Sequence, residues 1–245
     1  MNAFLKMTWI EMKLFAREPV AMFFTFAFPI IILMVFGSIF GNEPVVEFGN
    51  LGNVDVSVPG YIGMITGTIG MIGLPIALAN YREQGVLRRL RATPLNPSVI
   101  LGAQVTMNLV MQVVGVILLF ATARAVYDLQ FPEQMLSVAA AILLSGLSFF
   151  SLGFVLANLA PTPRTAQALG MGILFPMLFL SGGAMPREIL PETIRNVGEF
   201  LPMTHVIELV KGLWYGQGWD TTAVLVLSGI FIACVLISSR TFRWE

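Results

Sequence analysis

Three side-chain amides recur at helical spacing inside a long segment of the chain that carries no charge. Gln104, Asn108 and Gln112 are four residues apart, so a helix would project them within about a quarter-turn of one another. Carboxamides donate and accept hydrogen bonds without carrying a charge. Such a stripe suits two roles: hydrogen bonds between neighbouring helices, or the polar lining of a path for a solute. The sequence leaves both roles open.

A second set of chemically capable residues lies in segment 81–98, which is basic and helix-prone except at Gly85. Leu87 and Leu90 are three residues apart and therefore share one helical face. Four arginines surround them, at positions 82, 88, 89 and 91. An apolar pair ringed by arginines favours docking into a groove on a partner protein. A basic anchor at a membrane surface is the alternative, although it leaves the leucine face unexplained.

The residue sets that would support catalysis are missing. A P-loop requires Gly-Lys-Ser/Thr, but the three lysines are followed by Met7, Leu14 and Gly212. One histidine and one cysteine are too few for a Cys/His metal cluster. The sequence shows no Gly-x-Ser-x-Gly elbow and no nucleophile–base spacing. We therefore expect no enzyme activity, no metal and no cofactor on this chain.

The elements that must position these residues are long apolar helices. Hydrophobic residues make up 56% of the 245 residues, charged residues 11%, and the mean hydropathy is +0.82. About 20 apolar residues suffice for a helix to cross a bilayer. The sequence predicts an all-α, polytopic membrane protein with six spans, at about 20–40, 59–80, 99–122, 135–158, 165–183 and 221–239. These spans lack Asp, Glu, Lys, Arg and His, at least one of which ion-coupled carriers usually place in the membrane, so energy is expected from another subunit.

The distribution of charge predicts an orientation. If both termini and segment 81–98 are cytoplasmic, ten of the fourteen Lys and Arg residues lie inside and ten of the fourteen acidic residues lie outside. Excess positive charge on cytoplasmic loops is the usual arrangement in membrane proteins.

Two flanking segments and one glycine stripe are also expected to have defined structure. Residues 1–18 predict an amphipathic helix in the cytoplasmic headgroup region, with Lys6, Lys13 and Arg17 on one arc; an ordinary basic flank is the alternative. Segment 187–220 predicts two short outer helices separated near Pro202. Small residues in the second span, Gly63, Gly67, Gly70 and Gly73, indicate close helix packing, either within the chain or at a dimer seam.

The pattern Glu83-x-Gly85-x-Leu87-x-x-Leu90-x-Ala92-Thr93-Pro94 resembles the signature of type-2 export permeases of ABC transporters, the membrane subunits of drug, antibiotic, lipid and polysaccharide exporters. The six spans and the proline-rich outer segment resemble that family as well, so residues 1–245 are expected to form one transmembrane domain. The resemblance implies that segment 81–98 is a coupling helix contacting a separate ATP-binding cassette subunit. The implied contact residues are Glu83, Gly85, Leu87, Arg88, Leu90, Thr93 and Pro94.

The resemblance also implies the partners and the place of action. ATP and Mg would bind the partner subunit, and a second permease chain, identical or a close paralogue, would complete the path. Membrane lipid is expected as a partner and nucleic acid is not. The expected location is the cytoplasmic (inner) membrane of a bacterium or archaeon, crossed several times, with both termini inside.

The substrate remains open on the sequence alone. Abundant phenylalanine (19) and methionine (14), with uncharged spans, favour a hydrophobic drug, antibiotic or lipid-like compound. Export of a polysaccharide or glycolipid is the alternative within the family. An ATP-independent channel or carrier and a non-transporting membrane scaffold are the alternatives outside it.

Overall fold

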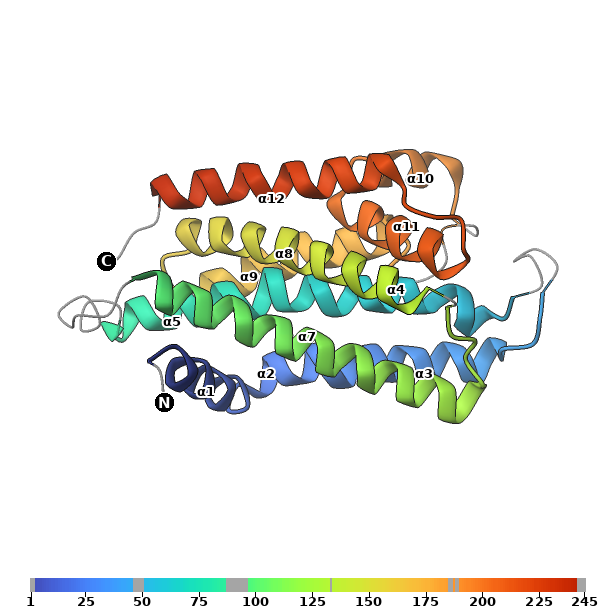
Figure 1. The fold of residues 1–245 in the computed structure, drawn as a ribbon, viewed down its shortest axis with the longest axis horizontal. Helices are drawn as coiled ribbons and strands as arrows, with labels where there is room; N and C mark the ends of the chain where they lie inside the picture. Colours follow the sequence, from blue (N-terminus) through green and yellow to red (C-terminus); the bar gives the residue numbers. More distant parts are fainter. Residues whose placement is uncertain are drawn as a thin grey trace.

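The computed structural model describes residues 3–45, 51–86, 97–132, 134–184, 187 and 190–241, which form an elongated helical bundle (Figure 1). Its regular elements are helical throughout these ranges, apart from one isolated bridge between Val45 and Leu51. The helices are α1 (Ala3–Phe15), α2 (Pro19–Met22), α3 (Phe28–Phe40), α4 (Asn53–Thr68), α5 (Leu74–Glu83), α7 (Pro97–Tyr127), α8 (Met135–Leu159), α9 (Pro163–Leu180), α10 (Glu192–Gly198), α11 (Pro202–Trp214) and α12 (Thr221–Thr241).

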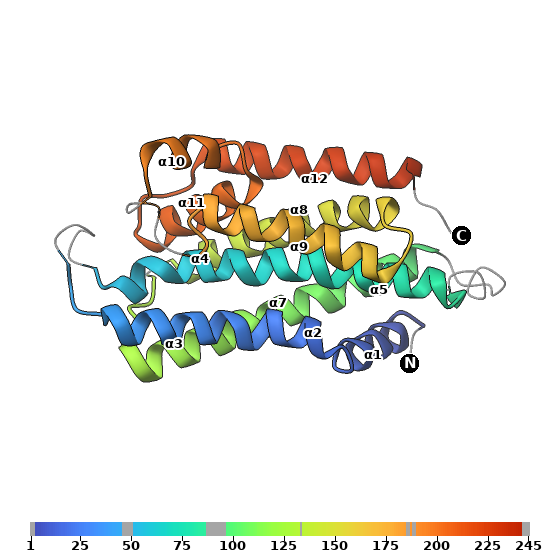
Figure 2. The ribbon, with the colours of Figure 1, turned by 180° about the vertical axis from the view of Figure 1, so that it is seen from behind.

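Five helical stretches are long and apolar enough to cross a membrane: Pro19–Phe40, Asn53–Glu83, Val99–Tyr127, Met135–Leu159 and Thr221–Arg240. The sixth expected span, 165–183, corresponds to α9, which is not among them. α9 has only 18 residues, and its first turns carry Arg164 and Gln167. It nevertheless runs beside α5 and α8 (Figure 2). Whether α9 completes a sixth crossing stays a prediction.

Two of the long stretches contain a π-helical segment, and each segment ends two residues before a proline. Phe23–Ala27 joins α2 to α3, whose second residue is Pro29. Ile69–Gly73 joins α4 to α5, whose second residue is Pro75. Proline lacks the N–H for the helical hydrogen bond, and its ring crowds the carbonyl four residues earlier. A wider π turn accommodates that crowding while the helix continues.

The second span begins earlier than the sequence analysis expected, at Asn53 rather than near residue 59. The side chain of Asn42 accepts hydrogen bonds from the Val54 and Asp55 N–H groups, at 3.0 and 3.2 Å. Pro59 cannot bond the Asp55 carbonyl, and the Tyr215 hydroxyl donates to that oxygen at 3.2 Å instead. Tertiary partners thus replace the backbone bonds that this start would otherwise lack.

The α4–α5 stretch is the core of the bundle, and its glycines pack within the chain. A Cβ built on Gly70 would lie 2.7 Å from the Phe149 carbonyl oxygen on α8, and one on Gly67 would lie 2.6 Å from Leu174 on α9. A Cβ built on Gly63 would lie 3.2 Å from the Ile207 side chain on α11. The stripe is therefore intramolecular packing at these three positions, where small residues let helices approach closely.

The two ends of the bundle differ in content. α1, the last turn of α5 and the last turn of α12 lie at one end, whereas α10 and α11 lie at the other (Figure 1). The second end contains the two short helices expected in segment 187–220, with Pro191 preceding α10 and Pro202 opening α11. α11 packs against α4, α8 and α12, so it inserts into the bundle.

Candidate functional site

The amide stripe on α7 faces the interior of the bundle. Gln104, Asn108 and Gln112 are each only 1% exposed. The Gln112 Nε2 atom donates to the Thr66 hydroxyl of α4 at 2.8 Å and to the Ile142 carbonyl of α8 at 3.1 Å. Gln112 therefore ties three helices together, as expected of an interhelical hydrogen bond.

The other two amides are in different surroundings. Asn108 lines a cavity beneath α1, and its Nδ2 has no hydrogen-bond partner among the described residues. Both polar atoms of Gln104 are buried and likewise lack a partner there. Buried polar atoms normally find partners, so unpaired ones call for a role. A translocation path along Gln104, Asn108 and Gln112 stays a prediction; Gln112 in addition bonds α4 and α8.

The start of the expected ATPase contact lies at the end of α5, beside α8. Arg82 Nη1 donates to the Ala157 carbonyl and Nη2 to the Asn158 side-chain oxygen at 2.9 Å, which fixes this end to α8. Gly85 follows with φ +65°, a left-handed conformation that glycine adopts at a helix C-terminus without strain. Glu83 is exposed in the last turn of α5. The remaining expected contact residues, Leu87, Arg88, Leu90, Thr93 and Pro94, lie outside the described residues.

The cavity beneath α1 occupies about 400 Å³ between α1, α2, α5 and α7. One carboxyl group, that of Glu11, is buried in its wall at 1% exposure. Glu11 Oε2 accepts a hydrogen bond from the Tyr81 hydroxyl at 2.5 Å, whereas Oε1 has no partner among the described residues. Apolar side chains form most of the remaining wall: Met7, Ile10, Leu14, Phe15, Ile76 and Met107.

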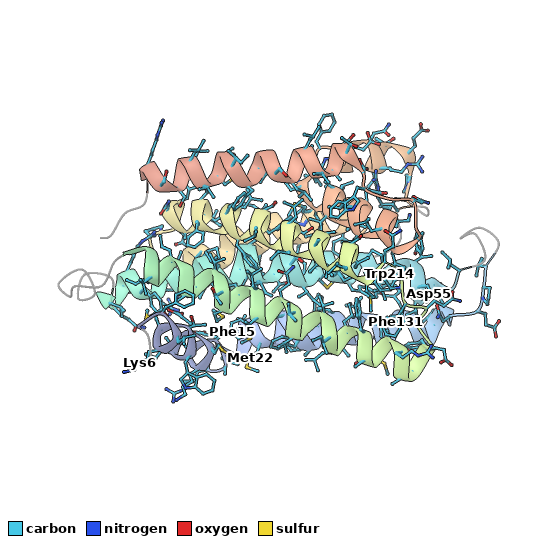
Figure 3. All side chains as sticks on the ribbon, in the orientation of Figure 1. Lys6, Phe15, Met22, Asp55, Phe131 and Trp214 are labelled. Carbon is cyan, nitrogen blue, oxygen red and sulfur yellow. The ribbon has the colours of Figure 1, made fainter. Side chains whose placement is uncertain are left out.

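Burial changes the acid–base behaviour of Glu11. Removal from water raises its pKa from 4.5 to about 7, and the hydrogen bond from Tyr81 partly opposes that rise. Glu11 was not among the site residues expected from the sequence. A signal was present, because at the helix period Glu11 falls far from the arc of Lys6 and Lys13, among apolar residues. Lys6, Lys13 and Arg17 are all exposed, and Figure 3 shows Lys6 and Phe15 on different sides of α1.

The opposite end of the bundle holds a second polar group of residues. Asp55 is buried, and its carboxylate accepts hydrogen bonds from the Gln130 N–H at 3.0 Å and the Gly52 N–H at 3.3 Å. Trp214 Nε1 donates to the Gln130 carbonyl at 3.2 Å. Asp55, Phe131 and Trp214 come together at this end (Figure 3). These bonds hold α11 to the start of α4.

An arginine organises the short helices at the same end. Arg187 Nη1 lies 2.9 Å from Glu208 Oε1 on α11, and Nη2 lies 3.8 Å from Glu199 Oε1 after α10. Nη2 also donates to the Arg195 carbonyl at 3.2 Å. The two short helices thus share one cation.

The described residues contain no group of three or more His, Cys, Asp or Glu side chains that could hold a metal ion. The sites that the bundle does offer are cavities, helix ends and buried amides.

Comparison with known proteins identifies the family. Residues 2–215 match the ABC-2 type transporter family. The chain is 27% identical to the inner membrane transport permease YhhJ of Escherichia coli (strain K12) over 202 residues, which cover 77% of this chain and 53% of that protein. It is 27% identical over 158 residues to the probable multidrug ABC transporter permease YbhR of the same strain, covering 64% and 43%.

A further relative is nodulation protein J of Rhizobium leguminosarum bv. viciae, 38% identical over 76 residues, or 31% of this chain and 29% of that protein. The chain spans about half the length of the inner membrane permease that it matches. The family match covers most of the sequence, including segment 81–98 and the amide stripe. This chain belongs to the ABC-2 type transporter family.

Proposed function

We propose that this chain is the membrane-spanning permease subunit of an ATP-driven exporter in a cytoplasmic membrane. The observation that carries the proposal is the family match over residues 2–215, which coincides with a bundle of long apolar helices. Permeases of this family are generally not catalytic. The sequence has no P-loop, so a separate ATP-binding cassette subunit would hydrolyse ATP and bind Mg.

Segment 81–98 is the proposed contact with that subunit. It follows α5 at the end of the bundle where Arg82 fixes α5 to α8. Movement of a docked partner would reach α5, and through the Arg82 bonds it would also reach α8. A second permease chain, identical or closely related, is the proposed partner in the membrane. Two identical chains would meet through a two-fold interface.

The proposed substrate is a hydrophobic drug, antibiotic or lipid-like compound. The cavity beneath α1 supports this class because its wall is mostly apolar and its volume, about 400 Å³, suits a drug-sized molecule. A relative named as a probable multidrug permease supports the same class. Polysaccharide or glycolipid export is the second candidate, because the family resemblance includes such permeases; it would require a polar path rather than an apolar cavity.

The test is ATP-driven transport by the assembled complex. Inside-out vesicles containing the permease and its ATP-binding subunit should accumulate a fluorescent hydrophobic dye when ATP is added. The control is a complex whose ATP-binding subunit carries a P-loop Lys→Ala substitution. Purified permease alone should neither bind nor hydrolyse ATP. Dye accumulation without ATP would instead favour a channel or carrier, and stimulation of ATPase activity only by a lipid-linked glycan would favour the second candidate.

A further inference from the structure

The cavity beneath α1 combines three features of a ligand-binding site. It is mostly apolar, it is about 400 Å³ in volume, and it contains a carboxyl group that is almost fully buried. Burial of a charged or polar group is costly unless a partner satisfies it. Glu11 and Asn108 both line this cavity. The Oε1 atom of Glu11 and the Nδ2 atom of Asn108 are buried and have no hydrogen-bond partner among the described residues.

The charged side chains among the described residues that line the cavity are all acidic. Glu11 contributes a carboxyl group from α1, Glu18 contributes another from the turn before α2, and Tyr81 contributes a hydroxyl from α5. α7 contributes Asn108, which is uncharged. The described lining residues include no lysine or arginine, and the cations of α1, Lys6, Lys13 and Arg17, are exposed rather than part of the wall.

We propose that this cavity binds a drug-sized amphipathic amine, with the ammonium group against Glu11 Oε1 and the apolar body against the side chains of α1, α5 and α7. An ammonium N–H donates the hydrogen bond that Oε1 lacks, and its positive charge matches the carboxylate. The Tyr81 hydroxyl holds the other oxygen, at 2.5 Å, so that Oε1 is left for the ligand. That such amines are the exported substrates rests on the proposed function. That the cavity binds them can be tested without transport.

The proton on Glu11 competes with the amine. In the empty cavity burial raises the pKa of Glu11 to about 7, so the group is largely neutral below that pH. A bound cation favours the carboxylate, and binding therefore releases a proton. Affinity should rise about tenfold per pH unit up to about pH 7 and then level off.

The test is equilibrium binding of dansylcadaverine to the purified full-length chain in phosphatidylcholine nanodiscs, without ATP and without a partner subunit. Its primary amine resembles that of lysine and stays protonated over this pH range. The N-acetylated dye has the same apolar body without the charge. Wild-type protein should bind the amine more tightly as pH rises towards about 7, and the acetylated dye should bind weakly at every pH.

Two variants isolate the role of the carboxyl group. Glu11→Gln should weaken binding of the amine at pH 8 by about ten- to hundredfold and abolish the pH dependence. Tyr81→Phe should shift the levelling-off to higher pH, because the Tyr81 hydrogen bond lowers the pKa of Glu11. The matched control is Glu192→Gln, which removes one exposed carboxyl group at the opposite end and should bind as wild type does.

Unchanged affinity in folded Glu11→Gln protein, or equal affinity for the acetylated dye, would overturn the proposal. Displacement of the dye when phosphatidylethanolamine replaces phosphatidylcholine would also overturn it, in favour of a lipid headgroup amine. The outcome is separable from that of the proposed function. Loss of ATP-driven transport with intact dye binding refutes the exporter, whereas transport without Glu11-dependent binding refutes this site.

Discussion

At the scale of single residues, the buried amides of α7 differ in what they do. Gln112 bonds the Thr66 hydroxyl and the Ile142 carbonyl, whereas Gln104 has no partner among the described residues. A shared helical face therefore did not imply a shared role. Spacing alone predicts which face a side chain occupies, because the helix period is fixed. It cannot predict whether a neighbouring helix offers an acceptor at that level.

Gln112→Leu should destabilise the bundle without changing the path. The substitution removes both hydrogen bonds to α4 and α8, worth about 0.6–2 kcal/mol each in a membrane. The measurement is the unfolding midpoint of the purified protein in denaturant. Gln217→Leu is the matched control, because Gln217 is exposed in the loop before α12. Unchanged stability with altered transport would instead place Gln112 in the path.

Glu11 should make the stability of the protein depend on pH. The pKa of Glu11 is raised in the folded state, from 4.5 to about 7, so the folded protein retains a proton that the unfolded chain has lost. Stability from this group is full below about pH 4.5 and falls as pH rises towards about 7. The thermal midpoint should therefore drop across that window in wild-type protein.

Glu11→Gln should remove this component, since glutamine does not titrate. The Glu192→Gln variant serves as control and should retain the drop. An identical pH profile for wild type and Glu11→Gln would show that the buried carboxyl group does not titrate in this range. The sequence did contain the signal for this residue, an acid away from the basic arc of α1, but burial depends on α5 and α7 closing over it.

At the scale of elements, glycine positions decide how closely α9 approaches the core. A Cβ on Gly170 would lie 2.1 Å from the Met71 carbonyl oxygen, whereas a Cβ on Gly172 would meet nothing within 4 Å. Gly170→Ala should therefore force α9 away and cost about 1–3 kcal/mol, as overpacking does. Gly172→Ala on the same helix should be neutral or slightly stabilising. Equal midpoints for the two variants in a denaturant titration would contradict the packing of α9.

Segment 81–98, the proposed contact with the ATP-binding subunit, can be tested at the two leucines that its sequence places on one helical face. Leu87→Asp or Leu90→Asp should release the ATP-binding subunit while leaving insertion of the permease intact. A carboxylate placed in a docked groove costs at least about 2 kcal/mol, and about 1.4 kcal/mol already weakens association tenfold. Arg91→Ala should be milder. The measurement is co-purification of the two subunits with matched permease amounts; retention of the partner by both Leu variants would make the segment a membrane anchor.

The long spanning helices and the helix break at Pro202 could be predicted from the sequence. The residues at which helices begin, and the lengths of the helices, were harder to predict. Apolar runs predict spanning helices because lipid offers the backbone no other hydrogen-bond partner. Pro202 predicted the break before α11, since proline is favoured in a first helical turn. The start of α4 was not predictable from Pro59, because Asn42 and Tyr215, distant in sequence, supply the hydrogen bonds that permit it. The close approach of α9 to the α4–α5 stretch depends on Gly170, which faces the backbone carbonyl of Met71. The sequence does not show which glycine of α9 has this position.

At the scale of the whole molecule, the two ends of the bundle should lie on opposite sides of the membrane. The end that bears α1 and the last turns of α5 and α12 is separated from the end that bears α10 and α11 by the length of the bundle (Figure 1). The first end carries the larger share of Lys and Arg, which favours the cytoplasmic side. The second end carries Glu199, which is exposed.

Single cysteines at Arg89, Glu47 and Glu199 test this orientation in a Cys234→Ser background. Cys234 is the only native cysteine, and it is buried, so its removal leaves no competing thiol. In intact cells a membrane-impermeant thiol reagent should label the cysteines at positions 47 and 199 but not the one at position 89. After permeabilisation all three should react, which controls for expression and accessibility. Labelling at position 89 alone in intact cells would show that the orientation is the opposite of the predicted one. Segment 81–98 would then face outward and could not contact an ATP-binding subunit in the cytoplasm.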